Sequence, residues 1–283
     1  MMFIIPKIGI MQGRLSEPTN NEIQSFPHLT WEEEFEKAHD CGFQVMEWIF
    51  DDVDNPLMNN SGINKIKFLS KKFNVKINSV CADFFMKAKL FDVTENLLEE
   101  NILVLENLIE QCSKTNIKIL EIPLVDSSSL KNVNNQNEFV SNLKKILPNF
   151  QKFDVTITLE TDLPSAEFKN LLEQFKTLNI KSNYDTGNSA SLGYNIEEEF
   201  SLLKPWLKNI HIKDRLYKGI TVPLGEGNVN FDLFFSNLSR VHYSGDLIIQ
   251  GARESKNNPQ HTPEEICKTY YTFVKQYVDK YLK

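Results

Sequence analysis

The sequence predicts an α/β protein that forms a single (β/α)₈ barrel domain over residues 1–283. Short apolar or β-branched runs alternate eight times with longer segments of helical period, which is typical of βα units around a parallel sheet. The length of 283 residues suits one barrel, and no low-complexity linker or shift of composition divides the chain.

The eight expected strands are short, partly hydrophobic runs, as in barrel strands that are buried on one or both faces. They lie at 7–15, 44–50, 76–84, 118–125, 155–161, 180–185, 207–213 and 246–251.

Helix start signals stand between these strands. Thr30 precedes Trp31 and three glutamates, and Thr94 precedes an amphipathic segment over 97–112, so both threonines are expected as N-caps. Pro164 and Ser165 are expected to begin another helix, and a last helix is expected over 262–281.

The overall composition excludes several classes of protein. With 41% hydrophobic and 24% charged residues the chain is an ordinary globular protein, and its formal net charge of −7 argues against nucleic acid as a partner. No run of about 18 apolar residues predicts a membrane span, and Pro6 and Lys7 end the apolar N-terminal run too early for a signal peptide. The four cysteines are scattered without a CxxC pair, so a reducing cytoplasm is expected.

The most informative polar residues end three successive predicted strands. Glu160, Asp185 and His211 each close a short apolar run. The carboxyl ends of barrel strands meet at one mouth, and a metal ion needs several donors within about 2 Å of one centre. These three residues are therefore predicted to bind a metal ion.

For other polar residues at strand ends, a purely structural role is a real alternative to a functional one. Glu47 and Glu121 are as readily hydrogen-bond partners in the core as functional groups, and Arg14 is as readily a tie within its loop. The residues predicted to bind substrate are Arg14, Glu47, Asn188, Lys213, Arg215, Glu226 and Arg253. Among them, Lys213 and Arg215 are suited to a carboxylate, a phosphate or an enediolate oxygen.

Four segments resemble the sugar phosphate isomerase/epimerase-like family of the xylose isomerase-like TIM barrel superfamily: 8–14, 184–188, 210–215 and 223–227. The resemblance spans nearly the whole chain. It implies a single divalent ion, with manganese expected and magnesium, cobalt or zinc as alternatives. Its ligands would be Glu160, Asp185, His211 and, where the family has a second Glu, Gln250.

The resemblance also implies proton transfer through a metal-stabilised enediolate, with Glu160 as base and ligand. Gln250 is a neutral donor that cannot carry a proton, so a second proton-transfer group must come from elsewhere. Glu254, an even number of residues beyond Gln250, is the candidate, and Glu226 in the preceding loop is another. A single base favours an aldose–ketose shift over epimerisation.

Two alternatives to a sugar isomerase or epimerase stay open. One is a metal-dependent dehydratase of a keto-polyol or keto-acid, which needs the same ligands and one base. The other is a sugar-binding barrel that has lost its chemistry, with Gln250 as the mark of that loss. Abasic-site endonucleases of the superfamily need a His-rich three-zinc cluster, which five scattered histidines do not supply. The expected partner is a small sugar or sugar-derived molecule, and assembly into a homo-oligomer is left open.

Overall fold

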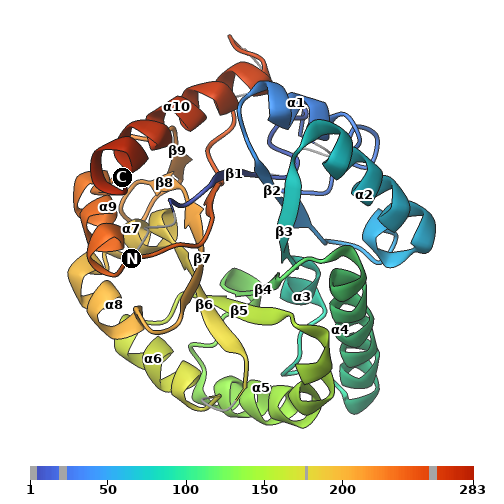
Figure 1. Cartoon of the computed structure of the whole chain (residues 1–283). Helices are drawn as coiled ribbons and strands as arrows, with labels where there is room; N and C mark the ends of the chain where they lie inside the picture. Colours follow the sequence, from blue (N-terminus) through green and yellow to red (C-terminus); the bar gives the residue numbers. More distant parts are fainter. Residues whose placement is uncertain (1–4, 19–23, 176–177, 255–259) are drawn as a thin grey trace.

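The protein forms a closed barrel of eight parallel strands surrounded by helices (Figure 1). The computed structural model describes residues 5–18, 24–175, 178–254 and 260–283. Around the barrel the strands follow the order β1-β10-β7-β6-β5-β4-β3-β2. The predicted fold is confirmed.

Each predicted strand contains one observed barrel strand. The strands are β1 Ile8–Met11, β2 Val45–Ile49, β3 Lys76–Cys81, β4 Ile119–Leu124, β5 Thr156–Thr161, β6 Ile180–Asp185, β7 Leu207–Ile212 and β10 Leu247–Ile249. The prediction for β1 ran on to residue 15. It ends earlier because the chain turns at Gly13, whose φ of 81° lies in the left-handed region.

A small antiparallel hairpin, β8 Asp214–Arg215 and β9 Thr221–Val222, was not predicted. Three backbone amides, of Gly225, Gly227 and Val229, donate to the carboxylate of Asp214. This carboxylate therefore holds the loop that follows β9.

The longer helices surround the barrel. They are α1 Glu34–Asp40, α2 Asn60–Phe73, α4 Glu95–Thr115, α5 Val133–Ile146, α6 Ser165–Glu173, α7 Thr186–Leu192, α8 Ile196–Leu203, α9 Phe231–Arg240 and α10 Pro263–Tyr281, with the short α3 Phe84–Lys87 after β3. No helix among the described residues combines the length and the apolar character that crossing a membrane would require.

Three of the four expected helix starts are confirmed. Thr94 accepts a hydrogen bond from Leu97 N at the start of α4, Thr262 forms a capping box at the start of α10, and α6 begins at Ser165. The expected cap at Thr30 is wrong. The helix there begins only at Glu34, and the Thr30 hydroxyl donates to Ser16 Oγ at 2.8 Å instead.

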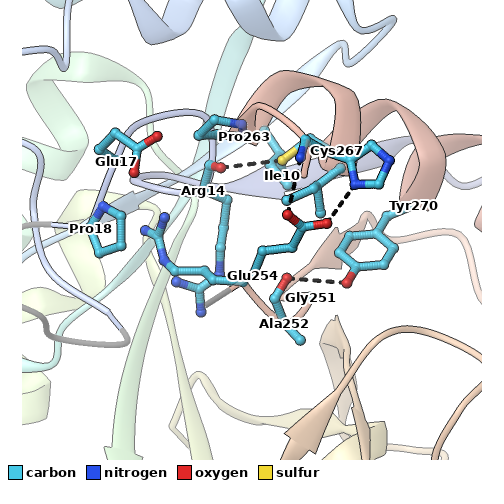
Figure 2. Close-up of a pocket in the computed structure, with 13 residues that line it drawn as sticks. Ile10, Arg14, Glu17, Pro18, Gly251, Ala252, Glu254, Pro263, Cys267 and Tyr270 are labelled. Carbon is cyan, nitrogen blue, oxygen red and sulfur yellow. Dashed lines mark hydrogen bonds and ion pairs between the residues drawn. The ribbon is translucent and has the colours of Figure 1, made fainter. Parts of the chain in front are cut away.

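Helix α10 packs beside β1, and a cavity of 370 Å³ lies between its N-terminal half and the residues that follow β10 (Figure 2). Arg14, Arg253, Glu254, His261 and Tyr270 are among its lining residues.

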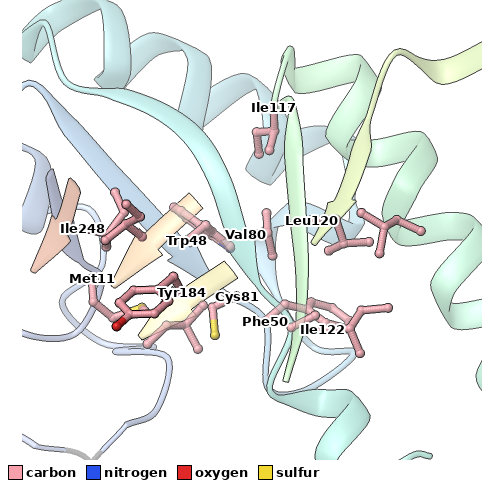
Figure 3. Close-up of a cluster of buried hydrophobic side chains, with 14 of the residues drawn as sticks. Met11, Trp48, Phe50, Val80, Cys81, Ile117, Leu120, Ile122, Tyr184 and Ile248 are labelled. Atoms are coloured by element: carbon pink, nitrogen blue, oxygen red, sulfur yellow. The ribbon is translucent and has the colours of Figure 1, made fainter. Parts of the chain in front are cut away.

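The apolar core lies mainly between the strands and the helices. Trp48 on β2 is fully buried, and its ring packs against Phe26 and Trp31 at centroid distances of 5.2 and 5.5 Å. Figure 3 shows part of this core, with Trp48, Val80 and Leu120 on three neighbouring strands. Because side chains alternate along a strand, Glu47 next to Trp48 points to the barrel interior.

A buried carboxylate fixes the loop after β1. Glu34 on α1 accepts hydrogen bonds from Gly13 N and Ser16 Oγ, both at 2.8 Å, and its side chain is fully buried. Burial raises the pKa of Glu34 to about 7, although both hydrogen bonds act in the opposite direction.

The raised pKa of Glu34 predicts a pH-dependent stability. Between the unfolded value of 4.5 and about 7 the folded state binds more protons, so the free energy of unfolding falls as the pH rises through this window. The Glu34 contribution amounts to about 3 kcal/mol at most. Urea denaturation from pH 4.5 to 8 should therefore show a flatter profile for Glu34→Gln than for the wild type. The exposed neighbour variant Glu33→Gln should keep the wild-type slope. Equal slopes for all three proteins would contradict this account.

Candidate active site

Three charged side chains meet inside the carboxyl end of the barrel. His211 on β7 lies between Glu47 on β2, with Nε2 2.6 Å from Oε1, and Glu160 on β5, with Nδ1 3.2 Å from Oε2. All three are buried. Glu47 thus takes the Nε2 side of the imidazole, and Nδ1 faces Glu160.

Amide side chains hold both carboxylates in place. Asn183 and Asn188 donate to the two oxygens of Glu160 at 2.7 and 2.6 Å. Asn209 donates to Glu47 Oε2 at 2.7 Å, and Arg215 Nη1 donates to Asn188 Oδ1 at 2.8 Å, which turns the Asn188 amide toward Glu160. The carboxylate of Glu160 therefore has a fixed orientation.

The charges of this group stabilise one another. Burial alone would raise the pKa of Glu160, but its hydrogen bond with His211 and the charges of His211 and Lys213 lower that pKa to about 2. Burial alone would lower the pKa of His211, but Glu47 and Glu160 raise that pKa well above its usual value. These interactions favour the carboxylate form of Glu160 and the imidazolium form of His211.

Glu121 on β4 adds a third carboxyl group. It is fully buried, and neither of its oxygens accepts a hydrogen bond from any described residue. Burial and the charge of Glu160 raise its pKa well above the usual range. Glu121, Glu160 and His211 each offer one ligand atom within 4.8 Å of the others, a donor set suited to a divalent cation.

A second candidate metal-binding group is less suitable for an ion. Glu47, Cys81 and Glu121 also lie within 4.8 Å of one another. Burial and the neighbouring carboxylates raise the pKa of the Cys81 thiol well above its usual value, and a protonated thiol is a poor ligand. Both oxygens of Glu47 are already bound to His211 and Asn209.

Of the four predicted ligands, Glu160 and His211 contact each other, whereas the side chains of Asp185 and Gln250 have other partners. Asp185 Oδ2 lies 2.9 Å from Lys213 Nζ, and Asp185 Oδ1 accepts from Asn188 N. The register of β6 and β7 places Asp185 beside His211, two residues beyond Asn183 along β6. Gln250 donates to Gln24 Oε1 at 2.6 Å, and its own Oε1 is buried with no hydrogen-bond partner among the described residues.

Three further predicted residues line the cavity beside α10, whose lining includes neither Glu160 nor His211. Glu254 is ion-paired with His261, with Oε1 2.5 Å from Nδ1. Arg253 donates to the backbone oxygens of Ser16 and Gly13 and so ties the end of β10 to the loop after β1. Arg14 lines the same cavity and also reaches Gln24 Oε1 at 3.3 Å. Glu226, the remaining predicted residue, is exposed in the loop after β9.

Sequence reasoning missed several residues of the site. Asn183 and Asn209 lie two positions before Asp185 and His211, so the period of two along a strand was the signal that could have found them. Gln24 lies in an irregular loop after β1, where no periodic pattern exists. Its donation to Asp83 Oδ2 at 2.6 Å depends on tertiary structure alone.

The family follows from a match over residues 35–269 to the xylose isomerase-like TIM barrel family. This chain belongs to that family. A putative L-ribulose-5-phosphate 3-epimerase, SgbU, of Haemophilus influenzae is 23% identical over 89% of this chain and 91% of the relative. The probable L-ribulose-5-phosphate 3-epimerase UlaE of Mycoplasma pneumoniae is 23% identical over 82% of this chain and 79% of the relative.

Solved structures show the same fold. A structure of L-ribulose 3-epimerase has a TM-score of 0.78 at 15% identity and covers 97% of this chain and 95% of its own. The IOLI protein with a bound zinc atom has a TM-score of 0.77 at 17% identity and covers 97% and 99%. The names of the two sequence relatives agree with the isomerase or epimerase class predicted from the sequence.

The pairing of His211 with Glu47 and Glu160 predicts how much the free energy of unfolding falls when the imidazole is removed. In the presence of a chelator, His211→Gln should lower the free energy of unfolding by about 3–5 kcal/mol, because Glu47 and Glu160 would remain buried without their partner. The double variant Glu47→Gln/His211→Gln should recover part of that loss. Urea denaturation measures both values, and the exposed His39→Gln serves as control. A double variant less stable than His211→Gln would contradict the proposed charge balance.

Proposed function

We propose that this protein is a divalent-metal-dependent epimerase of a ketose or ketose phosphate, which moves a proton at the carbon next to the carbonyl group. One observation carries the proposal. The carboxylate of Glu160 is held by Asn183 and Asn188 beside His211 at the mouth of a barrel of this family. The relatives are named as 3-epimerases, which favours epimerisation over the aldose–ketose shift.

A divalent ion fits the chemistry of the donors. Glu121, Glu160 and His211 would hold it through two carboxylates and one imidazole nitrogen, and the Glu121 oxygens have no competing hydrogen bond among the described residues. Asp185 and Gln250, the other predicted ligands, would join only after Lys213 releases Asp185 and the Gln250 amide oxygen turns to the ion. When bound, the ion would polarise the substrate carbonyl and acidify the neighbouring C–H. Manganese stays our expected metal.

The protein's own groups have distinct roles in this proposal. Glu160 is the base, and its two amide partners aim its carboxylate at the substrate carbon. Glu47 fixes the tautomer of His211 by accepting a hydrogen bond from Nε2–H. This hydrogen bond leaves Nδ1 for the ion. Lys213 and Arg215, on the strand end after His211, are the cations suited to substrate oxygens.

Some expectations remain predictions. These are a single domain over residues 1–283, a cytoplasmic location, and a small sugar rather than nucleic acid or membrane as the partner. The competing functions are a dehydratase and a non-catalytic sugar-binding barrel. Deuterium incorporation from the solvent separates both of them from an epimerase.

The deciding experiment is solvent-deuterium incorporation into a panel of ketoses, with manganese and after chelation. The panel is L-ribulose 5-phosphate, L-ribulose, D-psicose and D-tagatose. An epimerase should incorporate deuterium at C3 and form the 3-epimer, and chelation should abolish both. Loss of water from the substrate would identify a dehydratase, and absence of exchange in protein that has bound manganese would reject the proposal.

Two variants separate the base from the ligand. Glu160→Gln should reduce deuterium exchange by at least about 100-fold, because the proton acceptor is lost, while calorimetry still detects manganese binding. His211→Ala should lose manganese binding first. Exchange at the wild-type rate in Glu160→Gln would remove this residue from the role of base.

Metal affinity should increase with pH. His211 must lose its proton to bind the ion, and its raised pKa keeps it protonated through neutrality. The association constant for manganese should therefore rise by up to about 10-fold per pH unit between pH 6 and 8. Titration calorimetry in buffers of different ionisation enthalpy would count the proton released. A constant affinity over this range would show that His211 is already neutral.

A further inference from the structure

Glu199 is a buried carboxyl group that the proposed function leaves unused. It lies on α8, and only 5% of its surface is exposed. Its Oε2 accepts hydrogen bonds from Ser189 Oγ on α7 at 2.5 Å and from the Tyr184 hydroxyl on β6 at 2.8 Å. The Tyr184 hydroxyl also lies 3.2 Å from Ser189 Oγ. Glu199 therefore joins three successive elements of the chain, namely β6, α7 and α8.

Helix α7 also carries the amide that holds the proposed base. Asn188 Nδ2 donates to Glu160 Oε1 at 2.6 Å. Ser189 is the next residue along α7, and successive side chains on a helix are rotated by about 100° from one another. Asn188 accordingly reaches Glu160, whereas Ser189 reaches α8. A contact of Ser189 with α8 thus bears on the position of the Asn188 amide.

The two halves of α7 are fastened in different ways. At its start, the Thr186 hydroxyl exchanges hydrogen bonds with the backbone of Lys213 at 2.6 and 2.9 Å. Further along, Ser189 is fastened by the Glu199 carboxyl group. A cavity of 30 Å³ borders this second contact, and its lining includes Glu160, Asn188, Ser189 and Glu199. Because packing beside this half of α7 is incomplete, the hydrogen bonds to Glu199 add a constraint that van der Waals contacts do not supply.

A carboxyl group is an unfavourable choice for this position on packing grounds alone. The Tyr184 ring packs against Phe200 and Phe234 at centroid distances of 5.3 and 5.9 Å, so the surroundings are largely aromatic. Burial raises the pKa of Glu199 to about 7, although both of its hydrogen bonds act in the opposite direction. An apolar side chain would fill the space without directing either hydroxyl group, whereas a buried acceptor fixes one arrangement of its donors.

We propose that Glu199 is a positioning residue for the proposed reaction. Through Ser189 it fixes α7, and α7 places the Asn188 amide that aims the Glu160 carboxylate. The inference rests on the proposed function. Glu199 acts through these residues and takes no part in the proton transfer itself. Its removal should therefore slow the chemical step and leave substrate binding nearly unchanged.

Steady-state deuterium exchange at saturating manganese tests this inference, with the ketose that the wild type exchanges fastest. Glu199→Leu should lower kcat by about 10- to 100-fold with KM close to the wild-type value, because the base is present but misdirected. Glu199→Gln should keep most of the wild-type kcat, since its amide oxygen can still accept from both hydroxyl groups. Glu197 is exposed on the same helix, and the matched control Glu197→Leu should exchange like the wild type.

A double-mutant cycle tests whether Glu199 acts through Asn188. Asn188→Ala should lower kcat by itself. Adding Glu199→Leu to that variant should cause less than about a two-fold further loss, because both changes remove the same constraint on Glu160. Losses that multiply would show that the two residues act independently and would overturn the inference.

The other outcomes also decide the matter. A wild-type kcat in Glu199→Leu overturns the inference, as does an increase in KM with unchanged kcat, or a kcat in Glu199→Gln as low as in Glu199→Leu. Circular dichroism and the melting temperature establish that each variant is folded. If Glu199→Leu does not fold, Ser189→Ala takes its place under the same kcat and KM criteria. Failure of the wild type to exchange any sugar would overturn the proposed function, and this inference with it.

Discussion

The placement of His211 between two buried carboxylates is the interaction on which the rest of the site depends. A charged group inside a protein is stable only when it is paired and hydrogen-bonded, and Glu47 and Glu160 provide both conditions for the imidazolium. Because Glu47 lies on β2 and Glu160 on β5, the two contacts of His211 join strands that are distant around the barrel. The asparagines around the carboxylates follow from this pairing, because buried oxygens need donors.

The protein therefore has two different buried regions. Between the strands and the helices, aromatic and aliphatic side chains such as Trp48 fill the space. Inside the carboxyl end of the barrel, the strands present amides and carboxylates. Bulky branched residues usually fill such a barrel. Here the interior is polar instead, and the buried side-chain oxygens of Glu121 and Gln250 accept no hydrogen bond from any described residue. Stability gained from the outer core is what permits this polar centre.

The loop after β1 makes hydrogen bonds with several parts of the barrel mouth. Glu34 and Arg253 fasten its start from α1 and from the end of β10, and Gln24 reaches from its later part to Asp83 and Gln250. Loops placed on a rigid scaffold commonly carry the groups that decide specificity. The described residues of this loop therefore contact α1, the end of β3 and the end of β10.

The sequence by itself determined the barrel, because strand and helix periods are local properties of the chain. It also predicted that Glu160 and His211 lie close together, because residues at the carboxyl ends of parallel barrel strands converge at one mouth. It could not decide that Asp185 pairs with Lys213, that Glu254 pairs with His261, or that Glu121 lies close to Glu160 and His211. These outcomes depend on strand register and on how loops fold back over the mouth. Both are set by contacts between residues distant in sequence, which only the tertiary structure brings together.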